Sequence, residues 1–161
     1  MSLIRQKVKF DKKLLDQDAL KVLKKLTKSG YESYLVGGCI RDILLGHKPK
    51  DFDIATNATP EQIHKLFKRS RIIGRRFKLV HIMCSARKFI EVATFRAGKV
   101  KTSNDGLVIR DNYYGSLKDD VFRRDFTVNG LYYDINKSEV IDYVGGLKDL
   151  EILKINMIGN P

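Results

Sequence analysis

The chain has 161 residues, enough for one domain with a buried core, and 43% of them are hydrophobic, as in ordinary globular proteins. Its formal net charge of +12 favours a polyanionic partner, although a merely soluble, lysine-rich surface would give the same charge. No apolar run approaches the ~20 residues that cross a bilayer, and the isolated Cys39 and Cys84 support neither zinc nor a disulfide framework, so we expect a cytoplasmic protein that binds no membrane.

The first third of the chain predicts helices and strands in alternation. Residues 16–29 carry an apolar stripe at helical spacing, and Gly30 is placed to end that helix. The elements expected next are a strand over 31–36, the pair Gly37-Gly38, a short helix over 40–45 and a strand over 51–55.

The remainder predicts one clear helix start, one hairpin and one long loop. Thr59-Pro60-Glu61-Gln62 combines an N-cap, a proline at the first helical position and a capping-box glutamine, so a helix should run to about residue 68. The elements expected after it are strands over 77–84 and 88–95 joined by a tight turn, a long mobile loop over 96–115, a helix opened by a capping box at Ser116 and carrying 123–125, and short segments over 131–135, 140–144 and 152–158. Because a hairpin is antiparallel, we expect an α+β fold in which helices flank a mixed β-sheet.

The most informative motif is Asp51-Phe52-Asp53. Alternate residues of a strand point to the same side, so Asp51 and Asp53 should project together while Phe52 points into the core. Two adjacent carboxylates repel each other unless a cation lies between them, and Mg²⁺ usually binds through one or two carboxylates plus substrate phosphates. A lone Asp-x-Asp is more often a pair of solvated turn residues, so the motif needs support from its neighbours.

A glycine pair thirteen residues upstream gives that support. Gly37 and Gly38 end one strand and begin a helix, which leaves backbone N–H groups that can face phosphate, and Arg41 and Asp42 follow them. Metal-binding carboxylates beside a phosphate-binding turn are typical of enzymes that transfer phosphoryl or nucleotidyl groups.

Glu91 lies in Phe89-Ile90-Glu91-Val92-Ala93, a strand otherwise apolar on both faces. A lone carboxylate there would be costly to bury, so it should have a partner. One interpretation is a salt bridge to a lysine or arginine; the other is a third metal-site carboxylate beside Asp51 and Asp53, and the residue pattern leaves both open. Two cations ~3.5–4 Å apart would clamp the attacking and leaving oxygens of an in-line displacement, with no protein nucleophile and no P-loop.

Arg123-Arg124-Asp125-Phe126-Thr127 and Asn129 gather charge and hydrogen-bonding groups before an apolar stretch. Ordinary surface arginines at a helix end would look the same. The functional interpretation is a nucleotide-binding edge, with arginine on phosphate, Asp125 accepting from ribose hydroxyls and Asn129 near the sugar or triphosphate.

A second basic cluster and one histidine have simpler alternatives. The cluster is either a solvated face or a contact for triphosphate or the RNA backbone, and it comprises Lys68, Arg69, Arg71, Arg75 and Arg76. His81 stands in an apolar strand and is expected to be structural rather than catalytic.

Four stretches, taken in order, resemble the head domain of the class II nucleotidyltransferases of the polymerase β superfamily, which comprise CCA-adding enzymes and bacterial poly(A) polymerases. These stretches are LVGGCIRD at 35–42, DFDIAT at 51–56, IEVATFR at 90–96 and RRDFTVN at 123–129. The resemblance implies a polymerase β-like nucleotidyltransferase head over 34–161, preceded by an N-terminal extension and helix over 1–33.

The resemblance also implies roles for individual residues. Asp51 and Asp53 match the two metal-binding catalytic aspartates, Glu91 matches the metal-site carboxylate on the adjacent strand, and Asp125 matches a further active-site residue. Gly38 and Arg41 match phosphate contacts. The full set expected to bind nucleotide comprises Gly37, Gly38, Arg41, Asp42, Arg123, Arg124 and Asn129. Two Mg²⁺ ions are the implied cofactors, and ATP and RNA 3′ ends the implied partners.

Residues 72–82, 110–116 and 142–146 resemble poly(A) polymerases more than CCA-adding enzymes. The implied activity is template-independent addition of AMP from ATP to RNA 3′ ends, with CCA addition to tRNA as the alternative. From another class, a non-catalytic RNA-binding module would fit the charge, but it would not need three metal-facing carboxylates. The chain also looks like a catalytic head that stops where relatives continue into a base-reading helical neck, so we expect neck, RNA-binding regions and base selection to be missing from it.

Overall fold

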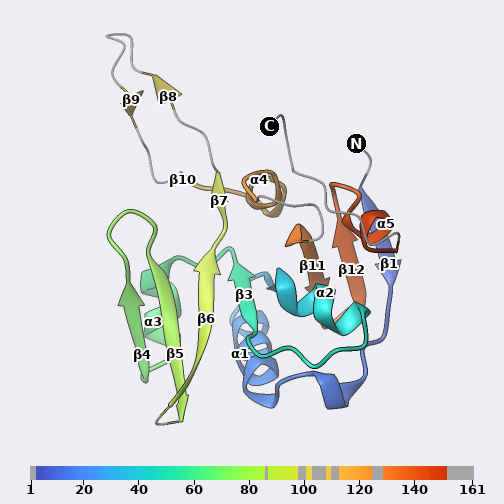
Figure 1. Cartoon of the computed structure of the whole chain (residues 1–161). Coiled ribbons are helices and arrows are strands. Elements are labelled where there is room, and N and C mark those ends of the chain that lie inside the picture. Colours follow the sequence, from blue (N-terminus) through green and yellow to red (C-terminus); the bar gives the residue numbers. More distant parts are fainter. Residues whose placement is uncertain are drawn as a thin grey trace.

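The computed structural model describes residues 3–85, 87–97, 101–102, 108–109, 113–124 and 129–151. Its centre is an eight-stranded sheet in the order β1-β12-β11-β2-β3-β6-β5-β4 (Figure 1). Strands β3 and β6 pair in parallel, and the other neighbours in this sheet are antiparallel. The strands are β1 Ile4–Lys7, β2 Ser33–Val36, β3 Asp53–Thr56, β4 Ser70–Ile73, β5 Leu79–Ser85, β6 Lys88–Thr94, β11 Leu131–Asp134 and β12 Glu139–Asp142. The expected α+β fold with a mixed sheet is confirmed.

The helices begin where the sequence supplies caps. Helix α1 (Gln17–Lys28) is capped by Asp16, whose carboxylate accepts hydrogen bonds from two amides of the first turn. Helix α3 (Pro60–Leu66) has the expected capping box between Thr59 and Gln62. The other helical elements are the 3-10 turn η1 (Lys12–Leu14), α2 (Gly38–Leu44), α4 (Leu117–Phe122) and α5 (Gly146–Glu151).

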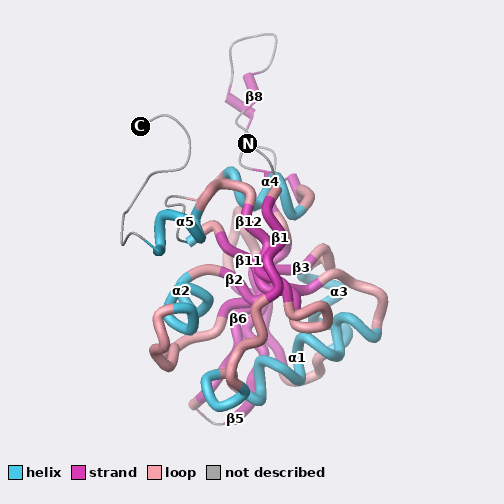
Figure 2. Tube along the Cα trace, turned by 90° about the vertical axis from the view of Figure 1, so that its right-hand side faces the viewer, coloured by secondary structure: helices cyan, strands magenta, loops and turns pink. Residues whose placement is uncertain are grey.

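Alternate residues of the central strands enter two different cores. On β2, Leu35 joins the larger core with the apolar faces of α1, α2 and α3, whereas Tyr34 and Val36 join a smaller core with α4. Figure 2 shows the strands stacked through the middle of the molecule with helices around them. The carboxylates of interest emerge on the face that carries the smaller core, because Val36 pairs with Asp53 in the sheet.

Several elements differ from the expectations. Strand β3 begins at Asp53 rather than at Asp51, α3 ends at Leu66, and α4 ends at Phe122, so Arg123 and Arg124 follow that helix instead of lying in it. The expected loop over 96–115 contains four two-residue strands, which pair as β7 (Arg96–Ala97) with β10 (Tyr113–Tyr114) and β8 (Lys101–Thr102) with β9 (Val108–Ile109). The strand expected over 152–158 lies outside the described residues.

Besides the 3-10 turn η1, the sequence did not predict β1, β4 or α5. Strand β1 pairs with β12, β4 forms the edge beside β5, and α5 follows β12. Helix α5 begins after a tight turn around Asp142, a fully buried residue whose carboxylate accepts four backbone N–H groups between Val144 and Leu147. That network satisfies the amides that a helix start leaves without intrahelical partners.

Candidate active site

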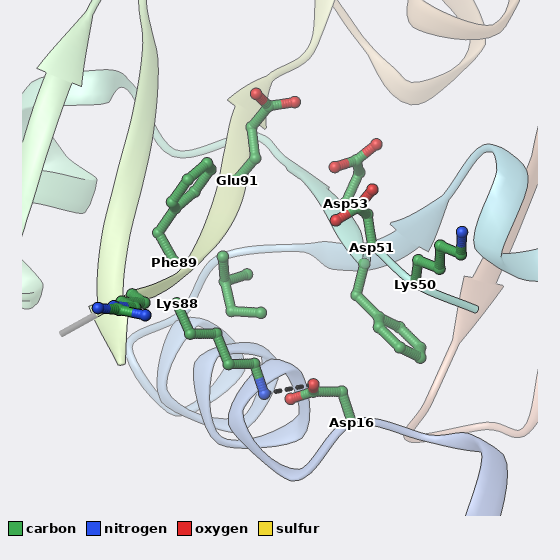
Figure 3. Close-up of a pocket in the computed structure, with 10 residues that line it drawn as sticks. Asp16, Lys50, Asp51, Asp53, Lys88, Phe89 and Glu91 are labelled. Atoms are coloured by element: carbon green, nitrogen blue, oxygen red, sulfur yellow. Dashed lines mark hydrogen bonds and ion pairs between the residues drawn. The ribbon is translucent and has the colours of Figure 1, made fainter. Parts of the chain in front are cut away.

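The parallel pairing of β3 with β6 brings two of the predicted carboxylates together. Asp53 is directly opposite Glu91 in this register, and both side chains project from the same face (Figure 3). Asp51 lies just before β3, and its side chain lies beside that of Asp53 in Figure 3. The expectation that Asp51 and Asp53 project together is therefore met in space, although the strand itself begins only at Asp53.

The electrostatics of this group suit a cation. The pKa of Asp53 is raised to about 6, first because burial removes hydration and then because the charges of Glu91 and Asp51 repel its own. Arg124 acts in the opposite direction. Among the described residues, no group of three or more His, Cys, Asp or Glu side chains stands at metal-binding distance. The charges of Asp51 and Glu91 raise the pKa of Asp53, and carboxylate oxygens of this kind are the donors that a hard divalent cation prefers.

Glu91 has a histidine as its neighbour. His81 Nε2 lies 3.3 Å from Glu91 Oε1, and the two residues are cross-strand partners on β5 and β6. The imidazole also stacks on the ring of Phe89, with centroids 4.0 Å apart and an interplanar angle of 16°. His81, expected to be only structural, therefore contacts a candidate site carboxylate.

A hollow of about 570 Å³ opens beside the carboxylates. Six of the residues that line it are Lys50, Asp51, Asp53, Arg87, Phe89 and Glu91. Its lower end is closed by Lys88, which makes ion pairs of 2.5 Å to Asp16 and 2.9 Å to Asp18; Figure 3 shows the first of these pairs.

The glycine pair lies on the other side of Asp53. Gly37 has φ = +77°, a conformation that strains any residue with a Cβ, and it is the N-cap of α2. A Cβ on Gly37 would stand 4.0 Å from Arg124 Nη1, which places that guanidinium over the glycine turn. Arg41 donates to Asn129 Oδ1 at 3.2 Å and to Asp42 Oδ1 at 3.2–3.3 Å. Arg41, Asp42 and Asn129 are thus brought together from positions far apart in the sequence.

Asp120 organises the arginines and was not singled out from the sequence. Its carboxylate, 1% exposed, accepts from Arg123 Nε at 2.9 Å, from Arg124 Nη2 at 3.2 Å, from the Arg96 amide at 3.0 Å and from the Tyr132 hydroxyl. Arg124 Nε also donates to the Tyr132 oxygen at 2.8 Å. Burial alone would raise the pKa of Asp120, but the two arginines outweigh it and hold the pKa below its usual value. An acid three and four residues before two arginines is the signal that could have identified it.

The remaining predicted residues fall in different places. Asp125 lies outside the described residues. The second basic cluster is divided. Arg71 lies opposite His81 in the register of β4 with β5. Lys68 and Arg69 instead line a separate hollow of about 330 Å³, together with Lys25 and Lys65. The cluster is therefore not one continuous site.

Comparison with known proteins identifies relatives over nearly the whole chain. The family model for the poly A polymerase head domain matches residues 33–156. Poly(A) polymerase I of Haemophilus influenzae is 53% identical over 154 residues, which cover 90% of this chain and 34% of that protein. Poly(A) polymerase I of Escherichia coli O6:H1 is 50% identical over 166 residues, covering 98% of this chain and 36% of that protein.

A solved structure with the same fold is the CCA-adding enzyme of Bacillus stearothermophilus in complex with CTP. It matches with a TM-score of 0.73 and 35% identity, over 89% of this chain and 33% of that one. The chain thus spans about a third of the length of the proteins it matches. In the part of the chain that the structure describes, no helix is both long and apolar enough to cross a membrane.

Proposed function

Because this chain belongs to the family of poly(A) polymerase head domains, we propose that it carries the catalytic centre of an RNA nucleotidyltransferase that adds AMP from ATP to RNA 3′ ends with two Mg²⁺ ions. The observation that supports this most directly is the parallel register that places Asp53 opposite Glu91, with Asp51 beside Asp53. Asp51, Asp53 and Glu91 supply the type of oxygen ligand that two-metal nucleotidyl transfer uses.

The metal ions would be held by Asp51, Asp53 and Glu91. When bound, such ions activate the attacking hydroxyl and neutralise the charge that develops on the pyrophosphate leaving group. The chain itself contributes orientation: His81 fixes Glu91 through the 3.3 Å contact, and the backbone pairing of β3 with β6 fixes Asp53 relative to Glu91.

The triphosphate would lie over the glycine turn, on the side of Asp53 away from Glu91. Arg124 stands over Gly37 and is held by Asp120 and Tyr132, so its guanidinium is already oriented when the nucleotide arrives. Arg41 is held similarly by Asp42 and Asn129. Asp125, next along the chain from Arg124, would accept from ribose hydroxyls as the sequence predicts.

We propose AMP addition rather than CCA addition because of the names and identities of the relatives that the chain matches. Two curated relatives at 50–53% identity are named poly(A) polymerase I, whereas the CCA-adding enzyme of known structure is 35% identical. CCA addition to tRNA is the alternative activity, and the same experiment separates the two.

The test is extension of a labelled RNA primer with Mg²⁺, with ATP or CTP supplied separately. The protein assayed is this chain, together with any longer protein that contains it. We expect extension with ATP, and a loss of about a thousandfold or more for Asp53→Asn because a metal ligand is removed. Glu61→Gln, which removes an exposed acid from the first turn of α3, is the control and should extend as the parent does.

Three outcomes would contradict the proposal in different ways. Full activity in Asp53→Asn would show that the carboxylate site is not required for catalysis. Completion of tRNA lacking its CCA end, with CTP used before ATP, would establish the alternative. RNA binding that persists in EDTA, together with no response to ATP, would indicate a non-catalytic RNA-binding module.

A further inference from the structure

The hollow beside the carboxylates exists because two parallel strands begin at different levels. The pairing of β3 with β6 starts at Asp53 and Glu91, so Lys88, Phe89 and Ile90 of β6 extend beyond the start of β3. The chain before β3 bends away at Lys50, and the space between it and the overhanging β6 is the 570 Å³ hollow. One end of this space is therefore open to Asp51, Asp53 and Glu91.

An aromatic ring occupies the wall of this hollow without being buried. Phe89 is 48% exposed, and it lies two residues before Glu91, so both side chains project from the same face of β6 about 7 Å apart. Its ring is supported by the parallel stack with His81 at 4.0 Å. A rigid ring open on its other side is the usual platform on which a nucleic-acid base stacks.

Two exposed cations flank the same space. Lys50 approaches it from the segment before β3, and Arg87 approaches it from the turn before β6. Lys88 is committed to Asp16 and Asp18, so it closes the hollow rather than reaching into it. An aromatic platform between a lysine and an arginine has the composition of a single-strand binding groove.

The geometry of the reaction determines which strand can bind there. In an in-line displacement the 3′ oxygen forms its bond to the α-phosphorus as the bond to the pyrophosphate oxygen breaks, and the hydroxyl proton passes to water. The attacking and leaving oxygens must therefore approach from opposite sides. Gly37, Arg41 and Arg124 lie on one side of Asp53, and Glu91 and Phe89 lie on the other.

We propose that this hollow binds the 3′-terminal nucleotide of the acceptor RNA, with its base stacked on Phe89 and the adjoining phosphates near Lys50 and Arg87. The identity of the strand as an acceptor rests on the proposed function, whereas the existence of a single-strand site in the hollow does not. Phe89 is then a substrate-binding residue, and His81 positions both Phe89 and Glu91.

The test is binding of an oligoadenylate that carries 2-aminopurine, a fluorescent adenine analogue, at its 3′ end, without ATP. Stacking on Phe89 should quench the fluorescence when the wild-type chain binds. Phe89→Ala should lose the quench and weaken RNA binding roughly tenfold, because base–aromatic stacking contributes about that much per base. Its affinity for ATP should stay within twofold of wild type.

Two sets of variants make the result specific. Phe122→Ala removes a phenylalanine of equal exposure, 48%, from α4 and should retain both quench and affinity. The double variant Lys50→Gln, Arg87→Gln changes only exposed side chains, so it tests the site even if Phe89→Ala folds poorly. It should lower the slope of log affinity against log salt by about 1.4, the value for two phosphate contacts on a single strand.

The outcomes separate this inference from the proposed function. Unchanged RNA affinity and quench in Phe89→Ala would overturn the inference, as would a loss of ATP affinity with RNA affinity retained, which would assign the hollow to the incoming nucleotide. A wild-type chain that binds and quenches the 3′ probe but extends no primer would support the groove while contradicting the proposed activity.

Discussion

Asp120 and Arg124 form a shielded ion pair one helical turn apart, with Arg124 Nη2 3.2 Å from Asp120 Oδ2. The carboxylate belongs to α4, whereas the arginine follows the end of that helix and reaches the glycine turn at Gly37. The rigid helix thus holds a cation over the predicted phosphate site. Such a pair orients the guanidinium at the cost of making the local fold depend on both partners.

Replacing Asp120 by asparagine should lower the free energy of unfolding by about 3 kcal/mol, because it leaves the charges of Arg123 and Arg124 without their shared counter-ion in a shielded place. Urea unfolding followed by circular dichroism measures this. Tyr132→Phe removes one hydroxyl from the same network and should cost about 1 kcal/mol. Equal effects of the two variants would show that the charge of Asp120 is not what stabilises the network.

Arg124→Lys keeps the positive charge but loses the planar fork that now donates to both Tyr132 and Asp120. We expect the KM for ATP to rise roughly tenfold, since one charge-assisted hydrogen bond contributes about 1.5 kcal/mol or more. Steady-state primer extension measures it. Arg76→Lys, in the exposed turn before β5, is the control. An unchanged KM in Arg124→Lys would indicate that this guanidinium does not contact the nucleotide.

Local sequence signals predicted much of this fold. The apolar stripe of residues 16–29 and the Thr59 capping box identified α1 and α3, and both depend on interactions within a few residues of the chain. The same is true of the β5–β6 hairpin. Edge strand β4 was missed because its residues read as part of a basic cluster, and β1 was missed because its partner β12 lies more than 130 residues away.

The candidate site was predictable in its residues but not in its arrangement. Asp51 and Asp53 were recognisable as an Asp-x-Asp motif and Glu91 as an acid in an apolar strand, yet their proximity depends on the parallel register of two strands separated by α3 and the β4–β5 pair. Sequence could not reveal that Glu91 faces His81, since cross-strand partners are set by hairpin register. The spacing of Asp120 from Arg123 and Arg124 was visible in the sequence, but the burial that makes this carboxylate organise both arginines was not.

Thr59→Ala removes one half of the capping box that starts α3. The variant should be less stable by about 1 kcal/mol, because the N–H of Gln62 loses its acceptor at the helix start. Thermal unfolding measures the loss, and primer extension at 25 °C should be unchanged because α3 supplies none of the candidate site residues. Thr59→Ser, which keeps a capping hydroxyl, should restore most of the stability. Failure of serine to do so would attribute the effect to the lost methyl group.

Asp16 should make stability depend on pH through its ion pair with Lys88. Burial by itself would raise the pKa of Asp16, but the Lys88 ammonium and the amides of Ala19 and Asp18 outweigh it and hold the pKa below its usual 3.8. The contribution of Asp16 to stability is therefore complete above about pH 4 and is lost as the pH falls through the lower, folded-state pKa.

Asp16→Asn retains a good helix cap but no charge, so it should be less stable than wild type by about 1 kcal/mol at pH 7, and the difference should vanish in acid. Urea unfolding at steps from pH 7 to pH 3 measures this. Asp11→Asn, at the cap of the preceding turn η1, is the control and should show a smaller change. A difference for Asp16→Asn that persists undiminished at pH 3 would place its origin in packing rather than in charge.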